Sequence, residues 1–593
     1  MAPQKKDIFK WIAVAVAVVA AAVSCILLQR WEEYTFFYRE QSQLFLFDRP
    51  DILSKLGGIG GFALVASQFI VQFFKLSWAG SVLTALLGVC AALILWKTVR
   101  KTGASQAAFP LCFLPVFFQE GALGDSLYYY QGFVAFVTIV VFLWLYVSLF
   151  QKKSKLVKVV AGVVISALLY WMVGSVALLF AVCIIILDAL HGSDGWYYGA
   201  ASLAVVLLFA WAAVRLGFIQ SMRMAILQDF YYEPLIHPGL YIHASWIALP
   251  LVVAMAVLAG KLKGNATQIV VACAAILLSL TALLRIPSHM DKKYYDMLRL
   301  NHFVVAGEWD SILSDRTARH ENFLMMNVRN LALSHKGQLL DKLFDYPQSG
   351  FMSLVAADDQ SDRILDVIAL DSHIYYQMGN VAHSQNKAFD ASVGVRFGSP
   401  AMMMRLIRTN LAWGAYGVAG KYISEMEKTW GYRKEAHEMR RFLWNDEAVE
   451  ADSELGYLRR CIPPVDHFVG MDPHKDLELI LSVEPDNTAA RDYYVAYMLL
   501  AKDVEGLKSY IENDPKAYNP DGSLHIHLQE AVLVYSEEDE TYCREHGVTD
   551  GTFNRYQSFK RKFLELGASN GNPIRDMKSF SDTFWYYFMF KKI

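Results

Sequence analysis

The residues best suited to chemistry lie at positions 29–56, directly after the first long apolar run of the chain. This segment, QRWEEYTFFYREQSQLFLFDRPDILSKL, interleaves carboxylates with arginines and amides. A carboxylate held among aromatic rings at a membrane surface can have a raised pKa and act as a general base. A neighbouring arginine can bind a phosphate through two parallel hydrogen bonds. Arg39 and Glu40, followed by Gln43, offer both kinds of group.

The same segment has the composition of a helix that lies flat on lipid headgroups. Its aromatic residues would then form an interfacial belt, and its charges would be solvated and perform no chemistry. The belt would consist of Trp31, Tyr34, Phe36, Phe37 and Tyr38. Both interpretations stay open from this segment alone.

These residues lie at a membrane surface only if the chain spans a membrane. The N-terminal half contains apolar segments long enough to do so. A bilayer core about 30 Å thick needs about 20 apolar helical residues. We expect nine spans, at roughly residues 11–28, 57–75, 79–96, 131–150, 156–172, 174–191, 196–215, 241–260 and 266–285. The shorter apolar piece 107–119 contains two prolines and is typical of a re-entrant or interfacial segment.

Lysine and arginine predict the orientation of these spans, because cytoplasmic segments are enriched in them. Three basic clusters fall on one side of nine spans: Lys5, Lys6 and Lys10; Lys152, Lys153, Lys155 and Lys158; Lys261 and Lys263. A fourth cluster falls on the opposite side: Lys97, Arg100 and Lys101. We predict an integral protein of the bacterial inner membrane with its C-terminal domain in the periplasm.

The charge balance divides the chain into two parts. The 593 residues have a net charge of −2, but residues 1–285 carry +8 and residues 286–593 carry −10. A nearly neutral chain excludes nucleic-acid binding by counterion release. We therefore expect a transmembrane domain over 1–285, with the long outer loop 29–56, and an extracytoplasmic domain over 286–593.

The C-terminal half has a helical pattern without strand alternation. Helix pairs meet at turns near Gly307, Gly337, residues 417–420 and Asp503. This pattern predicts an all-α chain in which the polytopic helical domain is followed by an α-solenoid of tetratricopeptide-like (TPR-like) hairpins. Such a solenoid binds a peptide or protein on its concave face, or else caps the membrane domain.

Known nucleotide and hydrolase motifs do not occur in the chain, and a metal site is weakly supported. There is no Walker A, GxGxxG, GxSxG or HExxH sequence. His237 and His243 lie near Asp229 and Glu233, which could bind a divalent metal, although such groups at an interface are more often solvated. We assign no metal. Two cysteines outside the apolar segments, Cys461 and Cys543, could pair only if they lie close together.

The order of features carries a resemblance to a known family. One span leads into the acid-bearing stretch EQSQLFLFDRPDILSKLGGIGGFALVASQFIVQFF, and further apolar helices and a large C-terminal domain follow. This organisation resembles the GT-C superfamily of membrane glycosyltransferases. The adjacent Glu32 and Glu33 are the nearest match to its acid pair, and its WWD-type motif is absent. The whole chain, with its ending DTFWYYFMF, also resembles multi-pass Bacteroidota membrane proteins that carry a C-terminal TPR-like domain.

The resemblance implies sugar transfer from a polyprenyl-phosphate donor to an extracytoplasmic acceptor, which could be a protein held by the solenoid. Glu40, or in its place Asp48 or Glu33, would be the base. The groups around the donor would be Arg39, Arg49, Arg223, Gln43, Asp125 and Tyr128.

Two other functions are compatible with this organisation. The first is a non-catalytic membrane scaffold whose outer helical repeats recruit protein partners during envelope assembly. The second is transport, which requires polar residues at mid-membrane depth. The expected spans carry few of them, with Asp188 and Arg215 near helix ends. Membrane lipid is a partner in every case.

Overall fold

The computed structural model describes residues 3–191, 196–316, 322–356, 365–395, 398–464, 473–519, 521–537, 539–568 and 572–591. Their regular structure consists of α-helices and short 3-10 helices, and the β-structure found among them is limited to isolated bridges. The predicted all-α class is therefore confirmed. The chain divides into a first unit, residues 1–295 with 428–431, and a second unit, residues 296–427 with 432–593.

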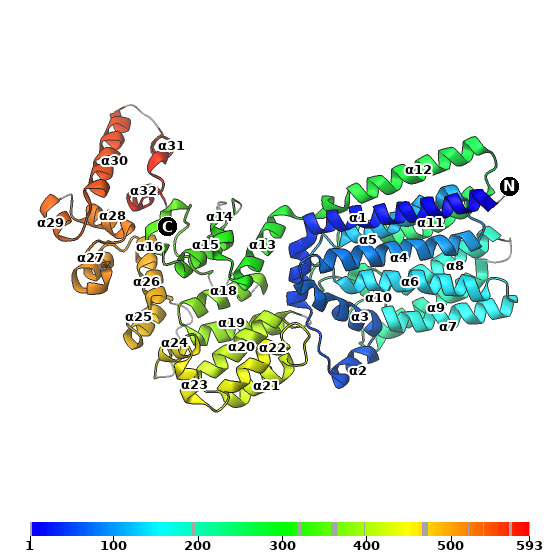
Figure 1. Ribbon diagram of the computed structural model, residues 1–593, viewed down its shortest axis with the longest axis horizontal. Helices are drawn as coiled ribbons and strands as arrows, with labels where there is room; N and C mark the ends of the chain where they lie inside the picture. The colour runs from blue at the N-terminus through cyan, green and yellow to red at the C-terminus, as the bar shows by residue number, and fades with distance from the viewer. Residues whose placement is uncertain are drawn as a thin grey trace. The chain divides into compact units, whose positions relative to one another are not determined.

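The long helices of the first unit run side by side (Figure 1). They are α1 (Pro3–Ser42), α4 (Ala79–Lys101), α6 (Tyr130–Phe150), α7 (Lys155–Val173), α8 (Ala177–His191), α9 (Trp196–Arg215), α11 (Ala244–Lys261) and α12 (Asn265–Leu284). Six helices of the described residues are long and apolar enough to cross a bilayer, and α8 and α9 contain shorter apolar stretches. The first unit thus has the helices of a membrane protein.

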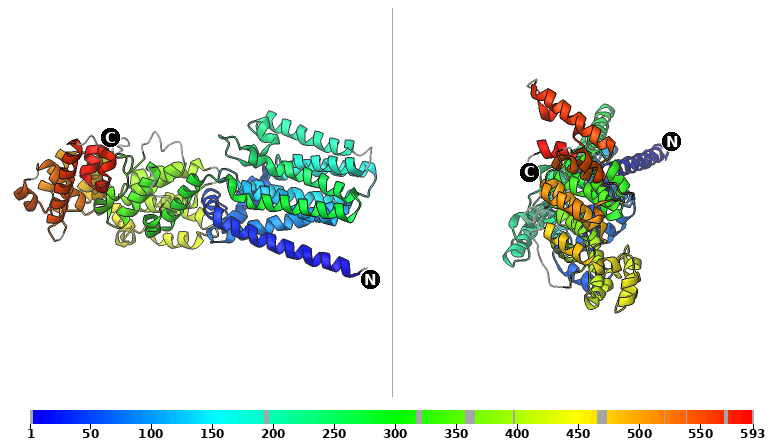
Figure 2. Two further views of the ribbon diagram at one scale, coloured as in Figure 1. Left: turned by 90° about the horizontal axis from the view of Figure 1, so that it is seen from above. Right: turned by 90° about the vertical axis from the view of Figure 1, so that its left-hand side faces the viewer.

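Helix α1 packs against the other helices mainly through its C-terminal half, and its N-terminal part diverges from them (Figure 2). Ser81 of α4 donates a hydrogen bond to Gln29 at 2.8 Å. A Cβ atom on Gly80 would lie 2.5 Å from the ring of Phe36, so only glycine permits this close approach. Trp11, in contrast, is 75% exposed, as expected for a side chain that faces lipid.

The segment predicted as the second span, 57–75, does not run along the bundle. Helix α3 (Gly61–Val71) and the 3-10 turn η1 (Gln72–Lys75) make up most of it. At its start, the Gly60 carbonyl accepts a hydrogen bond from Gln131 at 3.1 Å. At its end, the ring of Phe74 lies 5.1 Å from that of Tyr130. Since both ends meet the start of α6, the segment begins and ends at the same end of the bundle.

The proline-containing segment 106–122 runs the length of the bundle instead. It consists of η2 (Gln106–Phe113) and α5 (Leu114–Ala122), and it is largely buried against α11 and α12. Before its start, Ser105 donates a hydrogen bond to Gln268 in the first turn of α12. Beyond its end, Gly124 lies beside the Glu32 carboxylate in the last third of α1. It therefore connects the two ends of the bundle and is not re-entrant.

These two differences bring the basic clusters to one end of the first unit. Lys101 donates a hydrogen bond to Ser148 at the end of α6, at 2.6 Å. Lys261 donates to the Leu190 carbonyl at the end of α8, at 2.8 Å. The cluster at Lys97–Lys101 conflicted with the predicted topology because 57–75 was counted as a crossing. We call this end the basic end, and the end with Glu32 and Gly124 the opposite end.

The second unit begins within α13, and most of its helices are shorter than the long helices of the first unit (Figure 1). The helices described are α13 (Lys292–Ala306), α14 (Trp309–Ser314), α15 (Phe323–His335), α16 (Leu339–Lys342), α18 (Leu365–Gln377), α19 (Val381–Gly394), α20 (Pro400–Ala412), α21 (Tyr416–Met426), α22 (Arg433–Met439), α23 (Asp446–Ala451), α24 (Leu455–Arg460), α25 (Pro473–Val483), α26 (Thr488–Ala501), α27 (Val504–Asn513), α28 (Ile526–Tyr535), α29 (Glu540–Glu545), α30 (Asp550–Ala568), α31 (Pro573–Asp576) and α32 (Phe584–Phe590). Consecutive helices from α18 to α21 pack as hairpins.

One backbone turn recurs between paired helices of the second unit. A residue with positive φ ends the first helix at Gly307, Gly337, Gly379, Gly414 and Lys502. The residue after each donates its N–H to the carbonyl five positions earlier, at 2.8–2.9 Å, which caps the helix as in a Schellman motif. The turns predicted at Gly307 and Gly337 are confirmed, while the third lies at Gly414 rather than at 417–420.

Two of these glycines allow a paired test of backbone strain against crowding. A Cβ on Gly337 meets nothing within 4 Å, whereas one on Gly379 would lie 2.7 Å from Cys461 Sγ. Gly337→Ala should lower the free energy of unfolding by about 1–2 kcal/mol through strain alone. Gly379→Ala should add roughly 1–3 kcal/mol for overpacking. Thermal unfolding of the detergent-solubilised protein measures both, and equal losses would contradict the predicted crowding.

The aromatic C-terminus is part of the core of the second unit. Phe584, Trp585 and Tyr587 of α32 are buried with residues of α16, α26 and α28. Cys461 and Cys543 are buried free thiols in the same core. The sequence ending DTFWYYFMF is therefore explained by packing in this unit.

Candidate functional site at the opposite end of the bundle

The predicted outer loop 29–56 is mostly helical. Helix α1 continues to Ser42, and α2 (Arg49–Gly57) starts after only six intervening residues. The sequence explains this continuation, because residues 32, 36, 39 and 43 recur at helical spacing and are all buried. Glu33, Arg39 and Glu40 are therefore positioned by a rigid helix and not by a mobile loop.

Arg39 joins α1 to the turn that follows α5. Its Nη2 atom donates to the carbonyls of Leu123, Asp125 and Tyr128 at 2.5, 3.0 and 3.2 Å. The side chain is 1% exposed, and its Nε and Nη1 atoms have no hydrogen-bond partner among the described residues. The guanidinium therefore fixes the backbone of this turn and does not face lipid headgroups.

Asp125 is where three segments of the first unit meet. Its Oδ2 atom accepts hydrogen bonds from Tyr232 at 2.8 Å and from Tyr241 at 2.5 Å, and its Oδ1 atom accepts from the Leu127 N–H at 3.0 Å. Arg39 of α1 binds its backbone carbonyl. Burial and the Asp125 charge raise the pKa of Tyr232, so this phenol remains a donor. Asp125 itself stays partly accessible.

A short antiparallel bridge sets this geometry. Tyr128 pairs with Tyr232, and the Tyr129 N–H donates to the Tyr231 carbonyl at 2.8 Å. The Tyr129 hydroxyl also donates to Glu233 at 2.9 Å. The bridge holds the turn around Asp125 against the segment between α9 and α11, which supplies the tyrosine donors. Tyr128 points inward, where its hydroxyl accepts from Gln119 at 2.6 Å.

Two carboxylates lie inside the first unit below this turn. Glu32 of α1 and Glu120 of α5 are both 0% exposed. Ser24 donates to Glu120 Oε2 at 2.7 Å, and Gly88 leaves room for Oε1, since a Cβ there would lie 2.5 Å away. Neither Glu32 oxygen has a hydrogen-bond partner among the described residues. A buried acid of this kind needs a nearby cation or a proton, and Arg39 is the closest arginine in sequence on the same face.

These two residues weaken the sequence argument against transport, which rested on the scarcity of polar residues in the expected spans. Glu32 lies within the candidate span Lys10–Ser42. Glu120 lies on α5, a helix that is buried in the bundle. The signal for Glu120 was present in the sequence, because an unbroken apolar run, LCFLPVFF, ends two residues before it.

The three predicted bases occupy different environments. Glu40 is 5% exposed and accepts a hydrogen bond from Gln41 at 2.6 Å. Glu33 is partly exposed and accepts from Ser77 at 3.3 Å. Asp48 caps α2 by accepting from the Asp51 N–H at 3.3 Å. The structure therefore does not bring Glu40 or Asp48 to Asp125.

The remaining predicted binding residues are dispersed. Gln43 is buried at the end of α1. Arg49 is exposed in the first turn of α2. Arg223 forms an ion pair with Asp229, with 2.6 Å between Nε and Oδ1. Of the residues predicted to surround a donor, only Arg39, Asp125 and Tyr128 are brought together.

The histidines near Asp229 do not form a metal cluster. His237 Nδ1 lies 3.3 Å from the Asp229 carboxylate, which Arg223 already contacts. Among the residues that the structure describes, no group of three or more His, Cys, Asp or Glu side chains is arranged to hold a metal ion.

The arrangement around Asp125 is suited to accepting a proton at the surface of the first unit. A partly accessible carboxylate fixed by two phenols and one amide can orient a hydroxyl group and accept its proton. Helix α1 and the bridged segments hold it rigidly, as catalytic positioning requires. Arg39 supports this geometry through the backbone, so it is a positioning residue.

Comparison with known proteins gives a family for nearly the whole chain. Residues 8–591 match the model of a family of unknown function, DUF6057, and the chain belongs to this family. No curated protein and no solved structure matches the chain significantly.

Proposed function

For this member of a family of unknown function, we propose a membrane glycosyltransferase that takes sugar from a polyprenyl-phosphate donor. The observation that supports this proposal best is the meeting of three segments at Asp125. A lipid-linked donor presents its phosphate and sugar at a membrane–water boundary, and Asp125 belongs to the end of the bundle opposite the lysine clusters. If the lysines face the cytoplasm, Asp125 faces the extracytoplasmic side.

We propose a different base from the one expected from the sequence. Asp125 replaces Glu40 as the proposed base, because it is partly accessible and held by the donors Tyr232 and Tyr241. Glu33 is the second candidate, since it too is partly exposed. The helical hairpins of the second unit would present the acceptor, which could be a polypeptide, and neither a metal nor a nucleotide cofactor is part of this proposal.

Sugar transfer can be followed without knowing the sugar. Membranes of a deletion strain, complemented with each variant, are incubated with radiolabelled nucleotide sugars that charge the polyprenyl-phosphate pool. The measured quantity is label that moves from the solvent-extractable lipid fraction into the non-extractable fraction. Asp125→Asn should lower this rate about 100-fold, the typical contribution of a general base.

Asp51→Asn is the matched control for this experiment. Asp51 lies in α2 and, among the residues that the structure describes, its side chain pairs with the nearby Lys55 alone, at 2.7 Å, so the rate of this variant should stay near that of the wild type. Tyr241→Phe removes one donor to Asp125 and should give an intermediate loss. Transfer that is equal in wild-type and deletion membranes for every sugar would refute the proposal and leave the scaffold function.

The buried pair Glu32 and Glu120 favours a second candidate function, proton-linked transport. Ionisable residues inside a helical membrane domain commonly mark proton or substrate pathways. In this case Glu120→Gln, and not Asp125→Asn, would remove proton flux from proteoliposomes that contain a pH-sensitive dye. A flux that is the same in protein-free liposomes would exclude this function.

A further inference from the structure

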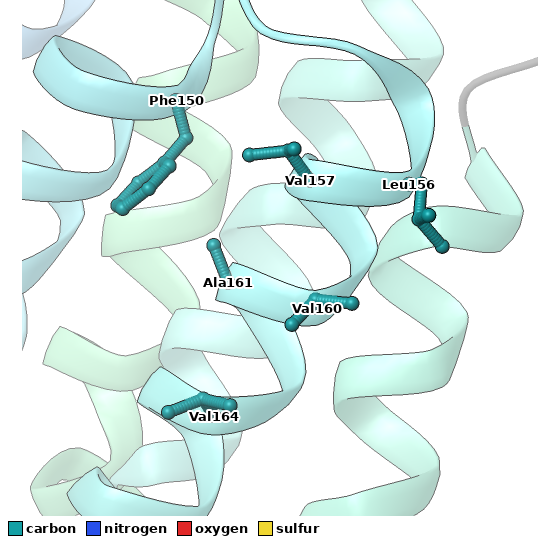
Figure 3. Close-up of a pocket in the computed structure, with 6 residues that line it drawn as sticks. All are labelled: Phe150, Leu156, Val157, Val160, Ala161 and Val164. Atoms are coloured by element: carbon teal, nitrogen blue, oxygen red, sulfur yellow. The ribbon is translucent and has the colours of Figure 1, made fainter.

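An apolar groove lies on the surface of α7 near the basic end of the first unit (Figure 3). Its volume is about 390 Å³, and six side chains line it: Phe150, Leu156, Val157, Val160, Ala161 and Val164. Every lining residue is aliphatic or aromatic, and Val160 is 53% exposed. Such a wall can hold a hydrocarbon chain but offers no group that would distinguish one lipid headgroup from another.

The turn that joins α6 to α7 adds charge at one end of this groove. Phe150 and Leu156, which line the groove, flank this turn, and the turn carries the exposed residues Lys152 and Lys153. No carboxylate of the described residues lies within ion-pair distance of Lys152 or Lys153. The two ammonium groups therefore lack an internal counter-charge within the described chain. They belong to the end of the bundle where the other basic clusters gather.

We propose that this groove binds an acyl chain of an anionic phospholipid whose phosphate lies against Lys152 and Lys153. The apolar wall supplies the site for the chain, and the lysines supply the selectivity for an anionic headgroup. A second copy of the protein is a poorer occupant, because a two-fold contact through α7 would bring identical lysine pairs together. The groove and the turn are continuous in sequence, so one lipid can occupy both.

The size of the selectivity follows from the two lysines. Each basic residue near a membrane surface favours anionic lipid by roughly 1 kcal/mol, so two correspond to a preference of about 30-fold over a zwitterionic lipid with the same chains. Val160→Trp should weaken the binding of both lipids equally, because the larger side chain fills the groove. Lys152→Gln combined with Lys153→Gln should weaken the binding of the anionic lipid only.

The test uses the full-length protein in detergent and native mass spectrometry. Palmitoyl-oleoyl phosphatidylglycerol and palmitoyl-oleoyl phosphatidylcholine are titrated separately, and the lipid-bound fractions are compared. We expect the preference for phosphatidylglycerol to fall at least tenfold in the Lys152→Gln/Lys153→Gln variant. Lys261→Gln combined with Lys263→Gln is the control, because it removes two lysines from the same end but away from the groove.

Four results would overturn the proposal. Equal binding of the two lipids to the wild-type protein would show an ordinary lipid-facing surface. An equal loss of selectivity in the control would assign the effect to the overall charge of this end. A lipid-free dimer that Val160→Trp dissociates would identify a second copy as the occupant. Competition by glycerol phosphate alone would show that the lysines bind a free headgroup and that the groove is not used.

Discussion

Replacing Arg39 with methionine should lower the free energy of unfolding of the first unit by about 3–5 kcal/mol, as for a broken buried charge network. The substitution keeps an unbranched apolar side chain but removes the donor to the carbonyls of Leu123, Asp125 and Tyr128. It also leaves the buried carboxylate of Glu32 without the arginine on its own helix face. Thermal unfolding in detergent, followed by tryptophan fluorescence, should show the loss as a lower midpoint.

The control for this prediction is Arg30→Met on the same helix. Arg30 is exposed and lies over the ring of Trp31, 5.6 Å from its centroid. Its loss should change stability by about 0.5 kcal/mol at most, as for an exposed cation–π contact. Arg39→Lys should lose less stability than Arg39→Met, because it keeps a cation on the Glu32 face and one nitrogen with three donors, the kind of group that Nη2 supplies here. A midpoint for Arg39→Met equal to that of Arg30→Met would show that the buried guanidinium contributes no net stability.

Arg39 also shows how far the sequence determines the candidate site. The spacing of Glu32, Phe36 and Arg39 is that of one helix face, so their burial could have been predicted from periodicity. The partners of Arg39 could not, because they are backbone carbonyls more than 80 positions later in the chain. Backbone carbonyls carry no signature in a sequence. The charge and aromatic content of this segment therefore suggested that Arg39 binds a phosphate. In the structure Arg39 instead connects α1 to the turn after α5 through hydrogen bonds.

The two corrected membrane segments have a related cause. Residues 57–75 are apolar enough for a span, but Gly60 and Phe74 both contact the start of α6. Residues 106–122 contain prolines that divide one pathway into η2 and α5. Hydropathy shows whether a segment is apolar enough for the bilayer core. It does not show whether the segment runs from one end of the bundle to the other. The position of the lysine cluster at 97–101 was the better guide, since it required one fewer crossing before α4.

The sequence predicted four hairpin turns in the second unit, but it missed the turn at Gly379 and expected the turn at Gly414 a few residues too late. Gly307 and Gly337 mark turns in the sequence because glycine readily adopts positive φ. The turn predicted near Asp503 lies at Lys502, a non-glycine residue whose φ is +56°. Helical packing on both sides holds a non-glycine residue in this conformation, and such packing is not visible in a local pattern.

Glu530→Ala should detach the C-terminal helix α32 from the core of the second unit. Glu530 is 1% exposed, and its Oε2 atom accepts from His527 Nδ1 and from the Phe584 N–H, each at 2.7 Å. His527 Nε2 in turn accepts from the Phe344 N–H at 3.3 Å. Alanine leaves two buried donors without an acceptor, at about 1–3 kcal/mol each. We expect stability to fall by about 3–5 kcal/mol in total.

Glu530→Gln separates the loss of the acceptor from the loss of the charge. Glutamine retains one carbonyl oxygen that can accept both bonds, so we expect a loss of about 1–2 kcal/mol. Glu540→Ala is the exposed control, since within the described part of the chain Glu540 pairs with Arg544 alone, at 2.8 Å. Urea unfolding combined with limited proteolysis measures both effects, because a detached α32 exposes its aromatic residues to chymotrypsin. Equal protection of the C-terminus in Glu530→Ala and the wild type would mean that aromatic packing alone holds α32, independently of the Glu530 network.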